Sequence, residues 1–246
     1  MPSTSTELLG DLARHPHLQE GTVYLTVDQT AGRGQDSNPW HASPGANLTL
    51  SILLRPVHLS VERLFALNEA VSLAVARCVR DFLPPHIARQ VRVKWPNDVY
   101  VGDRKIAGIL IQNGLRGSQL LYSVVGIGLN VNEAAFPPEL VNKATSLRLL
   151  TREELPLEDV CELLFANLGD TYRLTQLPKL TELRELYGQQ LYRLGTVSDF
   201  VRSCDGSRFA ATIVGVSVEG RLRLAYGGGR EELFDMRSIR MVPVGG

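Results

Sequence analysis

Three strand-like apolar runs in the middle of the chain are joined by turns that are too short for a crossover. They cover residues 90–95, 105–112 and 120–131, and Gly102-Asp103 and residues 115–118 form the turns between them. A parallel return needs a dozen or more connecting residues, so we expect neighbouring runs to pair antiparallel. The sequence therefore predicts an α+β fold and not a doubly wound parallel sheet.

The other predicted elements lie on either side of this central region. Two strands come before it, at 22–28 and 47–55. Apolar residues recur at helical spacing in four segments, which are 6–14, 60–82, 157–174 and 180–191. Short strands with glycine turns between them close the chain, at 196–201, 208–216, 222–226 and 232–241. Because about 50 residues of this kind are typical of a small β-barrel, we predict two domains, residues 1–190 and 191–246.

Charge and hydropathy narrow the functional classes. The 26 lysines and arginines balance the 26 acidic residues of this 246-residue chain. Without net charge there is no global field that would draw the protein to nucleic acid or to an anionic membrane. No apolar run approaches the roughly 18 residues of a membrane span, and the N-terminus lacks the pattern of a secretory signal. We therefore expect no membrane and no nucleic acid among the partners.

Cysteine and histidine spacing gives no sign of a metal or redox site. Cys78, Cys161 and Cys204 lie far apart, and the five histidines pair with none of them at ligand spacing. This pattern predicts free thiols in a reducing cytoplasm and no metal site built from these side chains. The first predicted strand begins at Thr22, which leaves less than the roughly 60 residues that an N-terminal helix-turn-helix module needs. A DNA-binding domain ahead of the strands is therefore not expected.

A glycine-bracketed arginine follows the first predicted strand, within the segment 27–40. Gly32 and Gly34 let backbone N–H groups approach an anion, and the Arg33 guanidinium offers a planar fork of donors. The loop that carries them, residues 29–46, is long for a connection in a compact domain, which favours a functional role. The alternative is that Gly-Arg-Gly forms only a surface turn.

Three further motifs lie on the central strands. In Lys94-Trp95-Pro96-Asn97-Asp98 the proline ends a strand and places Asn97 and Asp98 in a turn, which is either an acidic site or a solvated turn. In Lys105-Ile106-Ala107-Gly108 the lysine either reaches solvent or neutralises an anion. In Gly126-Ile127-Gly128-Leu129-Asn130 alternate glycines weaken a strand by up to roughly 1 kcal/mol each, which favours close approach of a flat ligand.

The four motifs in this order resemble those of the biotin protein ligases, over about residues 3–245. The resemblance implies a catalytic domain with a mixed β-sheet and helices, as in class II aminoacyl-tRNA synthetases, and a C-terminal SH3-like barrel. It also implies the reaction. Such ligases couple biotin to ATP, with Mg²⁺, to give biotinyl-5′-AMP and pyrophosphate, and then pass the biotinyl group to one lysine of a biotin carboxyl carrier protein. A monomer or a homodimer is expected.

The resemblance also assigns roles to residues. Lys105, Arg33 and Asp98 would be catalytic, since joining a carboxylate to a triphosphate needs cations and the acceptor amine needs a base. The residues expected to hold biotin or the adenylate are Ser3, Thr4, Gln29, Gly32, Arg33, Gly34, Trp40, Lys94, Asn97, Lys105, Gly108, Gly126, Gly128 and Asn130.

The chain departs from the family pattern at two places. Ser5 stands where a Ser-Thr-Asn biotin contact usually has asparagine, and Asp36-Ser37 stand where arginine and glycine are common. An acidic residue at position 36 should let biotinyl-AMP escape faster, because it repels the phosphate or contributes nothing. Two other interpretations stay open: a lipoate or octanoate ligase of related fold, and a non-catalytic module that binds biotin or a nucleotide.

Overall fold

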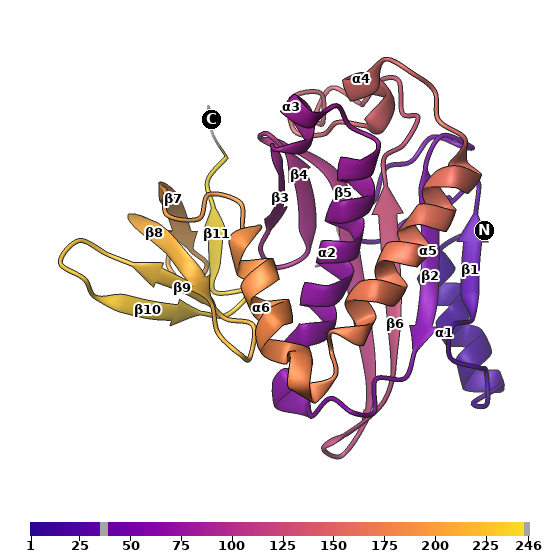
Figure 1. Ribbon diagram of the computed structural model, residues 1–246, viewed down its shortest axis with the longest axis horizontal. Helices are drawn as coiled ribbons and strands as arrows, with labels where there is room; N and C mark the ends of the chain where they lie inside the picture. Colours follow the sequence, from indigo (N-terminus) through magenta and orange to yellow (C-terminus); the bar gives the residue numbers. More distant parts are fainter. Residues whose placement is uncertain (35–38, 244–246) are drawn as a thin grey trace.

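The computed structural model describes residues 1–34 and 39–243, and Figure 1 shows their arrangement. Its larger sheet has six strands in the order β1-β2-β6-β5-β4-β3. These strands are β1 (Val23–Thr26), β2 (Leu48–Leu54), β3 (Val91–Lys94), β4 (Asp98–Val101), β5 (Arg104–Arg116) and β6 (Gln119–Leu129). Every neighbouring pair is antiparallel. The predicted α+β class and the antiparallel pairing of 105–112 with 120–131 are therefore confirmed, whereas 90–95 does not pair with 105–112, because β4 lies between them.

Two expectations about this sheet are wrong. The sheet is not mixed, because parallel pairing in the described chain is limited to isolated bridges such as Val93 with Leu191. The sequence prediction also lacks β4, which is four residues long and begins at Asp98, a residue that we expected in a turn. The turn ends one residue earlier, since Asp98 already pairs with Lys94 of β3 and with Gly108 of β5.

Helices cover both faces of the larger sheet (Figure 1). One face carries α2 (Phe65–Asp81), α5 (Leu157–Arg173) and α6 (Leu180–Gln189), whose apolar sides share one core with β2 to β6. The other face carries α1 (Thr4–Arg14), where Leu8 and Leu12 pack with Leu53 of β2. Because β2 lies between the two layers, all seven of its residues are buried. The short helices are η2 (Val61–Arg63), α3 (Pro85–Ala88), α4 (Leu147–Thr151) and η3 (Leu177–Lys179).

The second sheet follows α6 and has the strand order β10-β9-β8-β7-β11. Its strands are β7 (Val197–Arg202), β8 (Arg208–Val216), β9 (Leu222–Ala225), β10 (Glu231–Phe234) and β11 (Ile239–Met241). The run 232–241, predicted as one strand, is two strands. A turn over 236–238 separates them, and β10 pairs with β9 while β11 pairs with β7 at the opposite edge. The strand order is that of an open sheet, and the barrel and the domain boundary at residue 190 stay predictions.

The two sheets share apolar packing and hydrogen bonds around the Lys94–Asp98 motif. Phe200 and Ile213 of the second sheet lie in the same buried cluster as the apolar side of α2. Trp95 donates a hydrogen bond from Nε1 to the carbonyl of Gly220, 2.9 Å away. This bond joins the first residue of the β3–β4 turn to the second sheet. Within residues 1–34 and 39–243, no helix combines the length and the apolar character needed to cross a bilayer.

Helix α2 buries a carboxyl group against α6 without a hydrogen-bond partner. Glu69 is 1% exposed, and neither of its carboxylate oxygens has a partner within the described chain. Burial raises the pKa of Glu69 from its usual 4.5 to about 7, and the Arg184 guanidinium opposes the shift only in part. The folded chain therefore holds a proton on Glu69 at pH values where the unfolded chain has released it.

This burial makes the free energy of unfolding depend on pH. The folded pKa of Glu69 lies above the unfolded one. The contribution of protonated Glu69 to the free energy of unfolding is therefore fully present below pH 4.5 and is lost as the pH rises through 7. Glu69→Gln removes the ionisation. Its free energy of unfolding relative to the parent protein should therefore be higher at pH 8 than at pH 5, by up to about 3 kcal/mol from the shift. Thermal unfolding of Glu69→Gln and of the exposed control Glu182→Gln at both pH values tests this. An equal Tm difference from the parent protein at pH 5 and pH 8 would contradict it.

Candidate functional site

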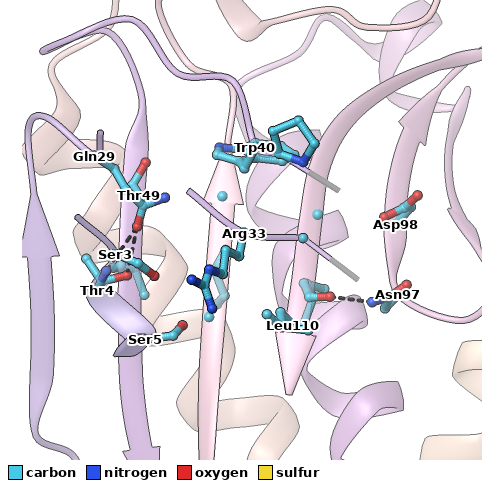
Figure 2. A pocket seen from close by; sticks show the side chains of 18 of the residues that line it. Ser3, Thr4, Ser5, Gln29, Arg33, Trp40, Thr49, Asn97, Asp98 and Leu110 are labelled. Carbon is cyan, nitrogen blue, oxygen red and sulfur yellow. Dashed lines mark hydrogen bonds between the residues drawn. The ribbon is translucent and has the colours of Figure 1, made fainter. Parts of the chain in front are cut away.

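A cavity of about 210 Å³ lies on the α1 side of the larger sheet. Its walls come from the first turn of α1, from β2, β5 and β6, from the β3–β4 turn and from the loop after β1. Its lining residues are Ser3, Thr4, Ser5, Gln29, Arg33, Gly34, Pro39, Trp40, Thr49, Leu50, Asn97, Asp98, Lys105, Gly108, Ile109, Leu110, Gly126, Ile127 and Gly128. Figure 2 shows the hydroxyl groups of α1 on one side, Asn97 and Asp98 on the other, and Arg33 and Trp40 between them.

The wall at α1 is a chain of neutral hydrogen-bonding groups. Thr4 donates its backbone N–H to Gln29 Oε1 at 3.0 Å. The Thr4 hydroxyl donates to the same oxygen at 3.4 Å. The hydroxyl of Ser51 lies 2.8 Å from the hydroxyls of both Thr4 and Ser5. Ser51 is fully buried, and the sequence analysis missed it. Its one signal is a serine in the middle of an otherwise Leu- and Ile-rich strand.

The opposite wall holds an ion pair between neighbouring strands. Lys105 near the start of β5 places Nζ 2.6 Å from Oδ1 of Asp98 at the start of β4. The two side chains are 31% and 26% exposed, so water screens the pair only in part. Asn97, in the turn before β4, donates a side-chain hydrogen bond to the carbonyl of Ile109 and accepts one at its own carbonyl from the Ile109 N–H at 3.1 Å. The turn is thus fastened to β5, and Asp98 stays against Lys105.

The glycines of β5 and β6 make room for the indole of Trp40. A Cβ atom at Gly128 would lie 2.4 Å from Trp40 Cε2, and one at Gly108 would lie 3.0 Å from Trp40 Cζ3. The ammonium of Lys105 lies 5.5 Å from the centre of the Trp40 ring. The glycine pattern predicts a ligand against these strands, and in this structure the groups that contact Gly108 and Gly128 are side chains of the protein. At Gly126 the close neighbour is Ser5 Oγ, at 2.8 Å from a Cβ.

The base of the arginine loop closes on itself. Trp40 donates its backbone N–H to the carbonyl of Gly32 at 3.0 Å, and Arg33 pairs with Pro39 in an isolated bridge. Gly32 does not line the cavity, but a Cβ there would lie 2.5 Å from Gln29 Nε2. Arg33 and Gly34 do line it, so the predicted arginine reaches the cavity. Asp36 and Ser37, the departure noted from the sequence, lie outside the described residues.

Two of the predicted site residues lie away from this cavity. Lys94 lines a second cavity between the two sheets and contacts Tyr100, with Nζ 3.2 Å from the hydroxyl. Burial lowers the pKa of Lys94. Asn130 is 3% exposed and donates from Nδ2 to the carbonyl of Thr145 at 3.0 Å, while its Oδ1 has no partner within the described chain. Neither side chain lines the first cavity, and the role of Lys94 and Asn130 beside the adenylate stays a prediction.

The charges that line the cavity suit an anionic ligand. Arg33, Lys105 and Asp98 are its ionisable side chains within the described residues, which leaves one cation in excess of the ion pair. The described chain holds no group of three or more histidine, cysteine or acidic side chains placed to bind a metal ion. A molecule with a neutral polar end and an acidic end would therefore meet matching groups at the two walls.

Proteins of known activity resemble the chain over most of its length. The bifunctional ligase/repressor BirA of Bacillus subtilis is 27% identical over 234 residues, which are 94% of this chain and 70% of that protein. The biotin–acetyl-CoA-carboxylase ligase of Mycobacterium tuberculosis is 36% identical over 147 residues, or 59% of this chain and 51% of that protein. The fold is that of a solved biotin protein ligase from Aquifex aeolicus in complex with biotin and ATP. That structure matches with a TM-score of 0.78 at 23% identity, covering 98% of this chain and 95% of the other.

A sequence profile agrees with these relatives. The profile of the biotin/lipoate A/B protein ligase family matches residues 1–130. The match includes the arginine loop and the three motifs on the central strands. Because the matched region covers more than half of the chain and contains every residue that lines the cavity, this chain belongs to the biotin/lipoate A/B protein ligase family.

Proposed function

We propose that this chain is a biotin protein ligase, which activates biotin with ATP and transfers it to a lysine of a biotin carboxyl carrier protein. The observation that carries the proposal is a single cavity with neutral hydrogen-bonding groups at one wall and the Lys105–Asp98 pair at the other. Biotin has the matching shape, since a neutral cyclic urea lies at one end and a carboxylate at the other. The relatives named above support the same substrate.

The neutral wall would bind the ring system of biotin. Ser3, Thr4 and Gln29 offer hydroxyl, amide and backbone groups that both donate and accept, as a urea requires. Ser51 holds Thr4 and Ser5 from behind, so these groups are fixed before a ligand binds. A site built to pair with a urea discriminates against a ligand without one, because its polar groups are then left unpaired.

The charged wall would carry the first reaction. A carboxylate oxygen of biotin attacks the α-phosphorus of ATP, the bond to the pyrophosphate oxygen breaks, and biotinyl-5′-AMP forms. Both reactants are anions, and Lys105 and Arg33 line the space where they would meet. Mg²⁺ in such sites is held by phosphate oxygens with one or two carboxylates. Asp98 is the carboxylate among the described lining residues, so it could hold a Mg²⁺ ion that arrives with ATP. The ion would neutralise charge on the phosphates.

The second reaction needs a neutral amine. The carrier lysine attacks the carbonyl of the mixed anhydride, an amide bond forms and AMP leaves. We assign Asp98 to orient that amine or to take its proton, because it is the acid among the described residues that line the cavity. The further expectations are a carboxyl carrier protein as partner, a monomer or homodimer in the cytoplasm, and an SH3-like barrel formed by residues 191–246.

The function is tested by the substrate dependence of pyrophosphate release. With ATP and Mg²⁺ present, biotin should stimulate release and yield biotinyl-5′-AMP, while lipoate and octanoate should not, because they lack the urea that the neutral wall matches. Parallel assays with the three acids measure this directly. Stimulation by lipoate or octanoate alone would instead identify an acyl ligase of the other branch of the family, and no stimulation by any acid would favour a binding module.

Asp98→Asn should separate the two half-reactions. It preserves shape and removes the base, so biotinyl-5′-AMP should still form at a rate within about tenfold of the parent, while transfer to the carrier should fall by about 10²- to 10⁴-fold. Single-turnover assays of each step measure the two rates, and Asp170→Asn is the matched control, because the Asp170 carboxylate is exposed near the end of α5. Equal loss in both steps would show that Asp98 supports the adenylate or its metal ion and not the incoming lysine.

A further inference from the structure

A buried carboxylate four residues after the end of β6 accepts three hydrogen bonds, two from Ser43 in the arginine loop and one from Asn47 just after that loop. Glu133 is 3% exposed. It accepts from the backbone N–H of Ser43 at 3.0 Å, from the Ser43 hydroxyl at 2.6 Å and from Asn47 Nδ2 at 2.7 Å. Burial alone would raise the pKa of Glu133, but these donors outweigh it and lower the pKa. The group is therefore an ionised acceptor matched to three donors.

These bonds tie the C-terminal half of the loop to the end of the sheet. Asn47 accepts the Val131 N–H at its own Oδ1, 3.0 Å away. Asn132 donates its N–H to the carbonyl of Ala46 at 2.7 Å. Ser146 donates its hydroxyl to the backbone carbonyl of Glu133 at 2.7 Å, which holds the backbone that carries the carboxylate. The segment 43–47 is thus joined to residues 131–133 by side-chain and backbone bonds together.

Trp40 stands three residues before this anchor. Three residues of extended chain span about 10 Å, so fixing Ser43 limits where the indole of Trp40 can lie. The indole packs on Gly128 and lies 5.5 Å from the ammonium of Lys105. His41, between Trp40 and Ser43, has Nε2 3.9 Å from a Glu133 oxygen, a contact that is ionic only when the imidazole is protonated.

We propose that Glu133 is a positioning residue for the ligase reaction, whose carboxylate holds segment 41–47 to the end of β6 and thereby fixes Trp40 over Gly128 and beside Lys105. The inference deepens the proposed function and rests on it. It adds a residue that lies outside the four motifs and outside the cavity. Glu133 acts on substrate binding through Trp40 and touches no reacting atom.

Substitution by glutamine removes the charge and keeps the shape. In Glu133→Gln the bonds from Ser43 and Asn47 are no longer charge-assisted. The new NH₂ group either faces the Ser43 N–H and the Asn47 amide as donor against donor, or faces the Ser43 hydroxyl, which must then turn to accept. Ser43→Ala removes one of the same bonds from the other partner and leaves the carboxylate intact. Glu139→Gln is the matched control, because Glu139 is exposed on the segment that follows Glu133.

The first measurement follows Trp40 itself. The chain has two tryptophans, so a Trp95→Phe background leaves Trp40 as the single reporter. Acrylamide quenching of Trp40 should increase in Glu133→Gln and in Ser43→Ala, and should not change in Glu139→Gln. The double variant should quench no more than the stronger single variant, because both changes break one contact. This readout needs neither biotin nor ATP.

The second measurement separates positioning from chemistry. In biotin-dependent pyrophosphate release, Glu133→Gln should raise the KM for ATP about tenfold and leave kcat within about twofold, as expected when binding is lost and the reacting groups remain. Unchanged quenching of Trp40 in a folded Glu133→Gln protein would overturn the proposal, and Ser43→Ala decides in its place if that variant does not fold. Increased quenching of Trp40 in a protein that shows no biotin-dependent pyrophosphate release would support the positioning of Trp40 by Glu133 and contradict the proposed function.

Discussion

The pair between Lys105 and Asp98 is the contact around which the cavity is arranged. It joins two neighbouring strands near their starts, with 2.6 Å between the ammonium and the carboxylate. Both groups are partly buried, so the loss of either partner would leave a charge that water compensates only in part. The β3–β4 turn brings Asp98 into place, and Asn97 and Trp95 fasten that turn to β5 and to the second sheet. The packing of the two sheets therefore also determines where the charged groups of the site lie.

The layers of the fold leave this pair open on one side. Helices α2, α5 and α6 cover one face of the larger sheet and α1 covers part of the other (Figure 1). The cavity lies beside the first turn of α1. Glycines at 108 and 128 keep the floor low enough for the indole of Trp40. The absence of side chains at Gly108 and Gly128 thus makes room on the sheet, and the loop after β1 supplies the side chains that cover this space. Glu133 anchors the far end of that loop.

Spacing in the sequence predicts the helices and most strands, because apolar periodicity directly reflects which face is buried. It also predicts that Arg33, Asp98 and Lys105 meet, but only through a resemblance of the whole motif order, since each motif alone fits a turn or a solvated lysine. Local patterns did not reveal β4, because its four residues lie between two turn signals, Pro96-Asn97 and Gly102-Asp103. Nor could they place Lys94 and Asn130, whose directions depend on partners such as Tyr100 and Thr145 from later parts of the chain.

The most direct test of the central role of this pair is the rate of adenylation without the cation. Lys105→Ala should fold, because Lys105 contributes no apolar core, and should release pyrophosphate in response to biotin about 10²- to 10³-fold more slowly than the parent. Lys143→Ala is the control: its exposed side chain is removed, while its carbonyl still accepts the backbone N–H of Lys105. A folded Lys105→Ala protein with the parent's rate would contradict the account.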